Sequence, residues 1–245
     1  MRMQHKEYSL PENGFVLLVD KPYGWSSFQV VNFFKWRLKK LCRQKKVKIG
    51  HAGTLDPLAT GLLILCIGKQ TKNIVSFQEQ AKEYKGSLNL GYHSPSYDLE
   101  QPITKQDYAL HSTEEIAAAF ESLEGEYEQS APMFSAKKFK GRRAFKLARE
   151  GKEVELKKNK ISVSAFDITE MRGSAIDFDI HCSKGTYVRS AVRDVGHALK
   201  TEAVMTALRR TKIGEHDIKD ALQHPDWAKS VIPHLVEKEE ESSKN

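Results

Sequence analysis

Cysteine is scarce in this sequence and long apolar runs are absent, and each shortage excludes a class of protein. Cys42, Cys66 and Cys182 are odd in number and far apart, with neither a C-x-x-C metal pair nor a disulfide framework. No apolar stretch approaches the roughly 18 residues of a membrane span, and the opening MRMQHKEYSLPENG lacks the apolar centre of a secretion signal. We therefore expect a cytoplasmic protein, in a reducing compartment, without a membrane partner.

Positive charge is in excess, which favours a polyanionic partner. The 245 residues include 39 Lys and Arg against 32 Asp and Glu, a net charge of +7, and 40% hydrophobic residues can supply a core. The stretch FKWRLKKLCRQKKVK is either a solvated helix face or a phosphate-binding surface. A second basic stretch, within residues 126–153, mixes aromatic and cationic residues and is either a flap over a nucleic acid or an exposed helical hairpin.

The order of predicted elements favours an α+β fold over a regular βαβ series. Helical spacing of Val30, Phe34, Leu38 and Leu41 predicts a helix capped by Ser26 or Ser27. Two further helices are expected, one after the capping box of Ser112 and Glu115 and one over TYVRSAVRDVGHALK. Strands are predicted over residues 15–20, 61–68, 82–90, 161–169 and 175–182, the last with alternating apolar and polar residues.

The stretch KIGHAGTLDPLATG contains a single carboxylate, Asp56, which has several interpretations. Asp56 followed by Pro57 suits the start of a helix, with Asp56 as its N-cap. A phosphate-binding P-loop does not fit, because Gln70 rather than Ser or Thr follows Lys69. The nearby glycines do not form the dinucleotide fingerprint G-x-G-x-x-G. A two-carboxylate acid–base site would need a second acid brought from elsewhere in the fold.

Five stretches, in order along the chain, carry a family resemblance over roughly residues 14–215. They are LLVDKPYGWSS, GHAGTLDPLATGLL, KEYKG, SAPMFSAKKFKGRRAFKLAREG and HCSKGTYVRS. Together they resemble the motifs of the TruB family, the tRNA pseudouridine synthases that act on the T-loop uridine. Five motifs in the same order are far more specific than one.

The resemblance implies a pseudouridine synthase fold, with a mixed, largely antiparallel central sheet flanked by helices and a basic RNA-clasping insertion. We expect an N-terminal extension over residues 1–13, a catalytic domain over 14–230 that includes an RNA-clasping flap at 126–153, and a tail over 231–245. Longer family members carry a C-terminal PUA-type RNA-binding domain, and residues 215–245 are too few for one.

The resemblance also implies an activity, the isomerisation of uridine-55 in tRNA to pseudouridine, with no cofactor and no metal. Asp56 matches the catalytic carboxylate, acting as a nucleophile on C1′ or C6 or by stabilising an intermediate after deprotonation at C2′. Arg189 matches the arginine that pairs with it, against the alternative of a surface arginine at a helix start. Tyr84 matches a tyrosine that stacks on uracil and can move a proton, against a plain strand tyrosine.

Further matches concern substrate binding. His51 corresponds to the histidine that enters the space left by the flipped base, and Leu208 to an apolar residue against the base; an exposed histidine and a core leucine are the alternatives. Tyr187 matches a second tyrosine of the pocket. Lys21 and Lys72 match RNA or pocket contacts, and Asp98 is a further substrate-binding position.

Two departures from the family pattern are present in the sequence. Ala52 replaces a threonine of the catalytic motif, a change that we expect to be tolerated. The stretch GYHSPSYDLEQ keeps the acid Asp98 but lacks the family's threonines, which puts RNA contacts there in doubt.

The expected partner is the T stem-loop of tRNA, bound by a monomer that requires no protein partner. A synthase for another RNA is one alternative, and a non-catalytic RNA-binding or RNA-folding protein is another. The joint presence of Asp56, Tyr84 and Arg189 favours an enzyme, because a pure binder gains nothing from a buried acid near phosphates.

Overall fold

The computed structural model describes residues 7–238 except 136, 153 and 155, and its chain contacts divide it into two compact units. Unit 1 combines residues 1–79 with 213–245, so both ends of the chain contribute to it, and unit 2 is the continuous stretch 80–212. No linker or change of composition in the sequence predicts this division. No helix in the described part of the chain is long and apolar enough to span a membrane.

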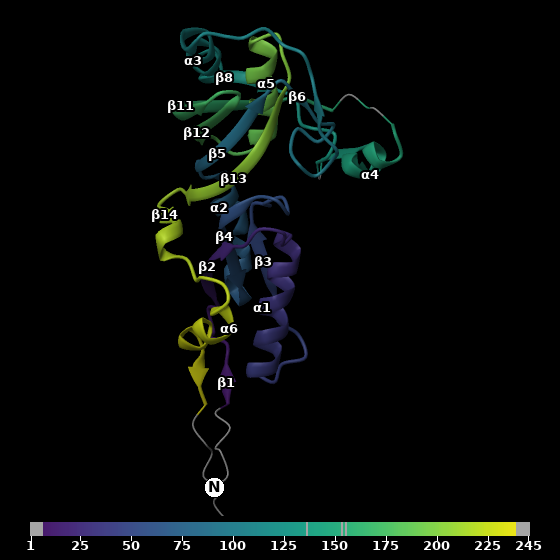
Figure 1. Ribbon diagram of the computed structural model, residues 1–245. Coiled ribbons are helices and arrows are strands. Elements are labelled where there is room, and N and C mark those ends of the chain that lie inside the picture. The colour runs from purple at the N-terminus through teal and green to yellow at the C-terminus, as the bar shows by residue number, and fades with distance from the viewer. Residues whose placement is uncertain (1–6, 136, 153, 155, 239–245) are drawn as a thin grey trace, which may run out of the picture. The chain divides into compact units, whose positions relative to one another are not determined.

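Unit 1 is built on an antiparallel group of strands covered by one long helix (Figure 1). Strand β4 (Thr60–Ile67) pairs with both β2 (Phe15–Lys21) and β3 (Ile49–Ala52). The helix is α1 (Ser27–Leu41). The remaining elements are β1 (Tyr8–Ser9) paired with β15 (Val236–Glu237), η1 (Gly68–Asn73), α2 (Ile74–Glu79), β14 (His216–Asp217), η2 (Ile218–Asp220), α6 (Trp227–Ser230) and η3 (Ile232–His234).

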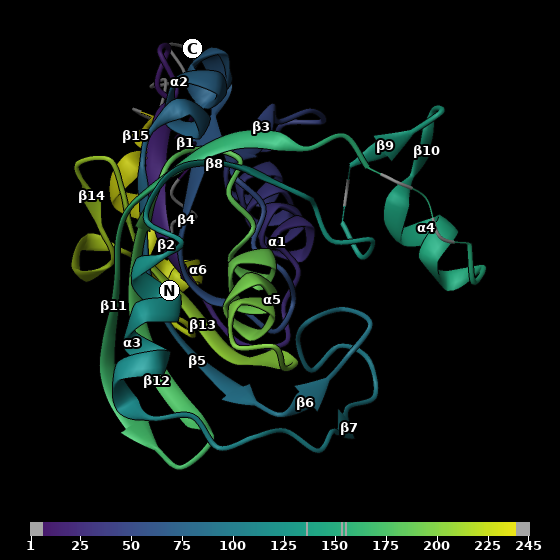
Figure 2. The same cartoon turned by 90° about the horizontal axis from the view of Figure 1, so that it is seen from above.

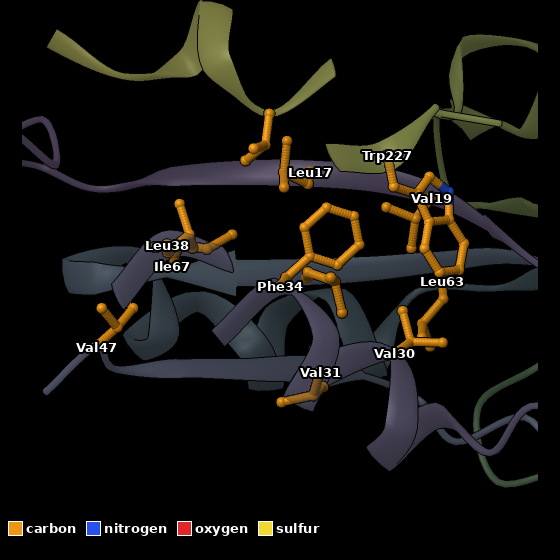
Figure 3. Packing of buried hydrophobic residues seen from close by; sticks show 12 residues of the cluster. Leu17, Val19, Val30, Val31, Phe34, Leu38, Val47, Leu63, Ile67 and Trp227 are labelled. Carbon is orange, nitrogen blue, oxygen red and sulfur yellow. The ribbon is translucent and has the colours of Figure 1, made fainter. Parts of the chain in front are cut away.

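The core of unit 1 lies between α1 and the strands. Figure 3 shows Phe34 and Leu38 of α1 beside Leu17 of β2 and Leu63 of β4, with Trp227 of α6 packed into the same cluster. These side chains are essentially inaccessible to solvent, and burying each contributes roughly 1.5–3 kcal/mol. Trp227 therefore attaches the C-terminal part of the chain to the N-terminal helix.

Helix α1 begins as the sequence predicts. Ser26 is its N-cap, and a reciprocal capping box joins Ser26 and Gln29, whose side chains each accept a hydrogen bond from the other's backbone N–H. Of the two serines proposed as the cap, Ser27 is instead the first helical residue and points into the protein.

Unit 2 is an antiparallel sheet with helices α3 (Thr113–Glu121) and α5 (Val188–Ala198) beside it (Figure 2). The strand order is β13 (Ala203–Ile213), β5 (Lys82–Leu90), β12 (Ala175–Cys182), β11 (Asn159–Arg172) and β8 (Gly125–Gln129), with the last residue of β13 assigned to unit 1. Its short pairs are β6 (Tyr92–His93) with β7 (Thr104–Lys105), and β9 (Lys138–Phe139) with β10 (Arg142–Arg143). The capping box of Ser112 and Glu115 is confirmed.

Strand β12 confirms the predicted alternation. Ile176, Phe178 and Ile180 are buried, whereas the intervening Asp177 and Asp179 are partly exposed. Opposite Phe178 the neighbouring strand places Gly86, where a Cβ would lie 2.4 Å from the Phe178 ring. A glycine is required there because the ring occupies the space of a side chain.

The basic segment at 126–153 is not a helical hairpin. Its described residues form the end of β8, the β9–β10 hairpin and the short helix α4 (Ala144–Arg149). Ala144 and Ala131 pack together in a small cluster with Leu156 and Tyr187, while Lys140, Arg142 and Arg149 are exposed. The alternative offered for this segment is therefore wrong, and its role as an RNA-clasping flap stays a prediction.

Candidate active site

Asp56 lies in a loop between β3 and β4, and no helix begins there. Residues 57–58 form a turn in which the Asp56 carbonyl accepts a hydrogen bond from Ala59 N at 3.1 Å. The interpretation of Asp56 as a helix N-cap is therefore wrong. Pro57 fixes its own φ near −65° and so restricts the backbone next to the carboxylate.

The first residue of α1 hydrogen-bonds the backbone of the Asp56 loop. Ser27 Oγ donates to Leu55 O at 3.0 Å and accepts from Leu55 N at 2.8 Å, and both residues are buried. On the other side of Asp56, Gly24 N donates to Pro57 O at 2.9 Å. The turn that contains DKPYGWSS therefore holds the backbone on both sides of Asp56.

Lys21 adds a third support to the same loop. Its side chain is 0% exposed, and Nζ donates to the carbonyls of Pro22 at 3.2 Å, Trp25 at 2.5 Å and Pro57 at 3.3 Å. A side chain with no exposed surface does not meet RNA in this conformation. The burial argues against a direct RNA contact of Lys21, and its role as a pocket contact stays a prediction.

His51 and Lys72 lie elsewhere in unit 1. His51 is half-buried on β3, opposite Leu65 of β4. Lys72 is exposed near the end of η1, so its ammonium group is accessible to a phosphate.

In unit 2, Arg189 lies in the first turn of α5 and is only 3% exposed. Nη1 donates to Ser96 O at 3.0 Å and Nη2 to Phe134 O at 2.9 Å, and Nε lies 3.5 Å from Asp98 Oδ2. These acceptors fix the plane of the guanidinium and offset the cost of burying its charge. The alternative of a surface arginine is wrong.

Asp98 is an acid that lies beside this arginine. It is 2% exposed, and its Oδ1 accepts from Glu100 N at 2.9 Å. The surrounding loop is held by buried hydroxyls, with Ser94 Oγ and Ser96 Oγ 3.1 Å apart. The stretch GYHSPSYDLEQ, which departs from the family pattern, therefore supports Arg189 and does not present Asp98 to RNA in this conformation.

The start of α5 is tied to the end of β8. Tyr187 N donates to Gln129 Oε1 at 2.8 Å, and Ser190 Oγ donates to Ser130 O at 2.9 Å. Gln129 is 1% exposed. These bonds fix the backbone on either side of Arg189.

Tyr84 and Leu208 occupy neighbouring strands of unit 2. Tyr84 is 9% exposed on β5, opposite Ile180 of β12, and Leu208 is half-buried on β13. Unit 2 thus carries Tyr84, Asp98, Tyr187, Arg189 and Leu208, and unit 1 carries Lys21, His51, Asp56 and Lys72. Within the units, the structure brings Lys21 to the Asp56 loop and Asp98 to Arg189.

Ser27 and Gln129 support the Asp56 loop and the start of α5, roles that are not expected from the sequence. The position of Ser27 could have been noticed in the sequence, because it is a polar residue on the same helical face as the apolar Val30, Val31 and Phe34, which is buried. Gln129 could not have been noticed in this way, because its buried position depends on the pairing of β8 with β11.

The cysteines are unsuited to nucleophilic chemistry. Burial raises the pKa of Cys66 and that of Cys182 to about 11, and raises the pKa of Cys42. Among the described residues no group of three or more His, Cys, Asp or Glu side chains has the arrangement of a metal site.

Comparison with solved structures defines the class of fold. The chain matches Cbf5 in the archaeal box H/ACA sRNP Nop10–Cbf5 complex with a TM-score of 0.59 at 23% identity, over 85% of this chain and 50% of that chain. It matches the Cbf5–Nop10–Gar1 complex with a TM-score of 0.64 at 24% identity, over 91% and 58%. The chain thus spans about half the length of the matched chain in each complex. The predicted α+β, mostly antiparallel pseudouridine synthase fold is confirmed.

Comparison of sequences defines the family. Residues 39–188 match the model of the TruB family pseudouridylate synthase N-terminal domain. A protein of Flavobacterium johnsoniae named tRNA pseudouridine synthase B is 48% identical over 85% of this chain and 92% of its own length. A protein of the same name from Chloroherpeton thalassium is 43% identical over 90% and 91%. The chain belongs to the TruB family.

Proposed function

We propose that this chain is a tRNA pseudouridine synthase that isomerises uridine-55 of the T loop to pseudouridine. The observation that carries the proposal is Asp56, a single carboxylate on a loop whose backbone is bound on both sides by Lys21, Gly24 and Ser27. Family membership supports it, since relatives that match over most of this chain are named tRNA pseudouridine synthase B.

The reaction breaks the bond between uracil N1 and C1′, turns the base and joins C1′ to C5. If the Asp56 carboxylate attacks C1′, the uracil leaves with the electron pair of the N1–C1′ bond, and C5 of the turned base then displaces the carboxylate. Addition of Asp56 to C6, or deprotonation at C2′ with Asp56 stabilising the intermediate, are the other two routes. In each route the C5 proton is lost at the end, and Tyr84 is our candidate for moving it.

We assign Arg189 to the orientation of Asp56. A guanidinium held by two carbonyls and the Asp98 carboxylate is a preorganised cation, whose planar set of N–H donors suits the orientation of a carboxylate. In this proposal Asp98 is a positioning residue that acts through Arg189.

The remaining residues bind the substrate in this proposal. Flipping the target uridine costs a few kcal/mol, which His51 offsets by entering the vacated space while Tyr84, Tyr187 and Leu208 contact the base. The exposed Lys72 binds phosphate, and the flap at 126–153 clasps the RNA. We further propose that the catalytic domain of residues 14–230 acts as a cytoplasmic monomer without a protein partner.

The test incubates the purified protein with an unmodified tRNA transcript and maps pseudouridine along it. We expect a product at position 55, and expect Asp56→Asn to abolish it while most tRNA binding remains, because the carboxylate performs the chemistry and other residues hold the RNA. A product outside the T loop would redirect the substrate assignment. Binding without any product would indicate an RNA-binding protein, and normal turnover by Asp56→Asn would exclude Asp56 as the catalytic residue.

A further inference from the structure

The outer face of helix α1 combines exposed aromatic rings with lysines. Phe28 is 68% exposed and Trp36 is 60% exposed, and they lie on the same helical face as Asn32, Lys35 and Lys40. The opposite face of α1 is buried in the core of unit 1. We call the outer face the α1 stripe, consisting of Phe28, Asn32, Lys35, Trp36, Lys39 and Lys40.

The charge around the α1 stripe is of one sign. Residues 27–48 contain eight Lys and Arg and no Asp or Glu, one more positive charge than the net +7 of the entire chain. Arg37 donates to the Ala228 carbonyl, and Arg43 pairs with Glu7. In the part of the chain that the structure describes, no carboxylate pairs with Lys35 or Lys40, and both residues are exposed.

Two exposed aromatic rings are not expected on a helix face that only contacts solvent. Large aromatic side chains are usually well buried, yet Trp36 is exposed with Lys40 Nζ only 5.3 Å from its ring centroid. Stackable rings among cations are the combination by which proteins bind unpaired nucleic acid, because rings stack on bases while lysines bind phosphates. A membrane surface would instead need a contiguous apolar face, and here Asn32 and lysines separate Phe28 from Trp36.

The α1 stripe starts at the candidate catalytic loop. Ser27, the first residue of α1, hydrogen-bonds both the N–H and the carbonyl of Leu55, the neighbour of Asp56. At 1.5 Å per residue the helix extends about 22 Å from there, and Trp36 lies about 14 Å along it. An RNA whose uridine reaches Asp56 therefore has flanking nucleotides within reach of the stripe.

We propose that the α1 stripe is a second RNA-binding surface, on which Lys35, Lys39 and Lys40 bind phosphates and Trp36 stacks on an unpaired base outside the flipped uridine. The inference rests on the proposed function for the identity of the RNA. It predicts that the stripe contributes to affinity and not to the chemical step.

The experiment measures the Kd of unmodified tRNA in an Asp56→Asn background, where no turnover is expected, and kcat and KM with position 56 intact. Trp36→Ala is expected to raise Kd about 5- to 140-fold by loss of stacking, with Trp36→Phe recovering most of the affinity. Lys35→Ala and Lys40→Ala should each reduce the slope of log Kd against log salt by about 0.7–0.9. In all four variants kcat should be unchanged.

The controls lie on other surfaces of unit 1. Val75→Ala removes a side chain that is 63% exposed on α2, and Lys219→Ala removes an exposed lysine of η2. Thermal unfolding of each variant verifies that the fold is intact. We expect it to be intact because the substituted side chains are exposed.

Three results would overturn the proposal. The first is a Kd for Trp36→Ala no higher than that for Val75→Ala. In the second result, Trp36→Ala keeps its RNA affinity but no longer binds anionic lipid vesicles. In the third, Trp36→Ala keeps its RNA affinity but changes the oligomeric state of the protein in gel filtration. If Trp36→Ala weakens RNA binding but the protein without substitutions makes no pseudouridine, the α1 stripe is an RNA-binding surface and the proposed function is wrong.

Discussion

At the residue scale, two lysines of the same unit have opposite surroundings. Lys21 is fully buried and donates to three backbone carbonyls, including that of Pro57 beside Asp56. Lys72 is exposed on η1. The same residue type is therefore assigned two roles, the positioning of a loop and the binding of phosphate.

Substitution of each lysine by methionine, which keeps most of its volume, separates these roles. Lys21→Met should lower the free energy of unfolding by about 1–3 kcal/mol, because buried carbonyls lose their donor, and should lower kcat with little change in the Kd of tRNA. Lys72→Met should leave stability unchanged and reduce the salt dependence of tRNA binding. Urea unfolding, single-turnover kinetics and binding titrations measure these effects. Equal effects of the two substitutions on tRNA affinity would contradict the assignment of Lys21.

Motifs indicate which residues carry the chemistry more readily than they indicate what surrounds them. The motifs single out Asp56 and Arg189, whose catalytic roles stay predictions, and the structure shows that Arg189 is buried. One acid that the structure places beside Arg189 is Asp98, from a loop far away in the sequence. Contacts of this kind depend on tertiary packing, and no local pattern predicts them.

At the scale of elements, adjacent serines at the start of α1 perform different tasks. Ser26 closes the capping box, which stabilises the helix itself. Ser27 is buried and binds both backbone groups of Leu55, which holds the Asp56 loop. The helix start therefore joins a secondary-structure signal to a support of the candidate active site.

Alanine substitutions should distinguish the two serines. Ser26→Ala is expected to destabilise the protein by about 1 kcal/mol, the usual cost of a lost cap, without changing kcat. Ser27→Ala leaves the buried Leu55 N–H without its hydroxyl acceptor, at a cost of about 1–3 kcal/mol, and should lower kcat because the loop loses its fixed geometry. Chemical denaturation and turnover of unmodified tRNA measure both. A kcat loss in Ser26→Ala as large as in Ser27→Ala would contradict the separation of roles.

Elements with strong periodicity were predictable, and those fixed by tertiary contacts were not. The alternation of β12 and the spacing and cap of α1 are confirmed. Strand β13 (Ala203–Ile213) was missed because AVMTALRRTKI is rich in helix-forming Ala, Leu, Met and Arg. Its place beside β5 overrides that propensity. The Asp-Pro pair at Asp56 is equally compatible with a helix start and with a turn, and the short connection to β4 selects the turn.

At the scale of the whole molecule, unit 1 depends on contacts between the two ends of the chain. Trp227 fills the core beneath α1, and His234 stacks on Phe15 of β2 with ring centroids 5.4 Å apart and planes inclined by 13°. Local sequence patterns predict a tail over residues 231–245. The described residues 231–238 instead include η3 and β15, which pack on or pair with the N-terminal part of the chain.

The stacked histidine makes the stability of unit 1 depend on pH. Partial burial lowers the pKa of His234 below its ordinary value of 6.5, so the unfolded chain binds a proton more readily than the folded one. Its contribution to stability is therefore fully present above pH 6.5 and is lost as the pH falls through the lowered pKa of the folded state. All three tryptophans, Trp25, Trp36 and Trp227, lie in unit 1, so their fluorescence reports the unfolding of this unit.

We expect the urea midpoint measured by tryptophan fluorescence to fall between pH 7.5 and pH 5. In His234→Phe, which keeps an aromatic ring against Phe15 but has no group to protonate, the fall should be smaller. The difference between the two proteins isolates His234 from the other titrating groups, which both share. If the two pH profiles were parallel throughout this range, protonation of His234 would not be coupled to folding, and the ring stack would join the chain ends through apolar contact alone.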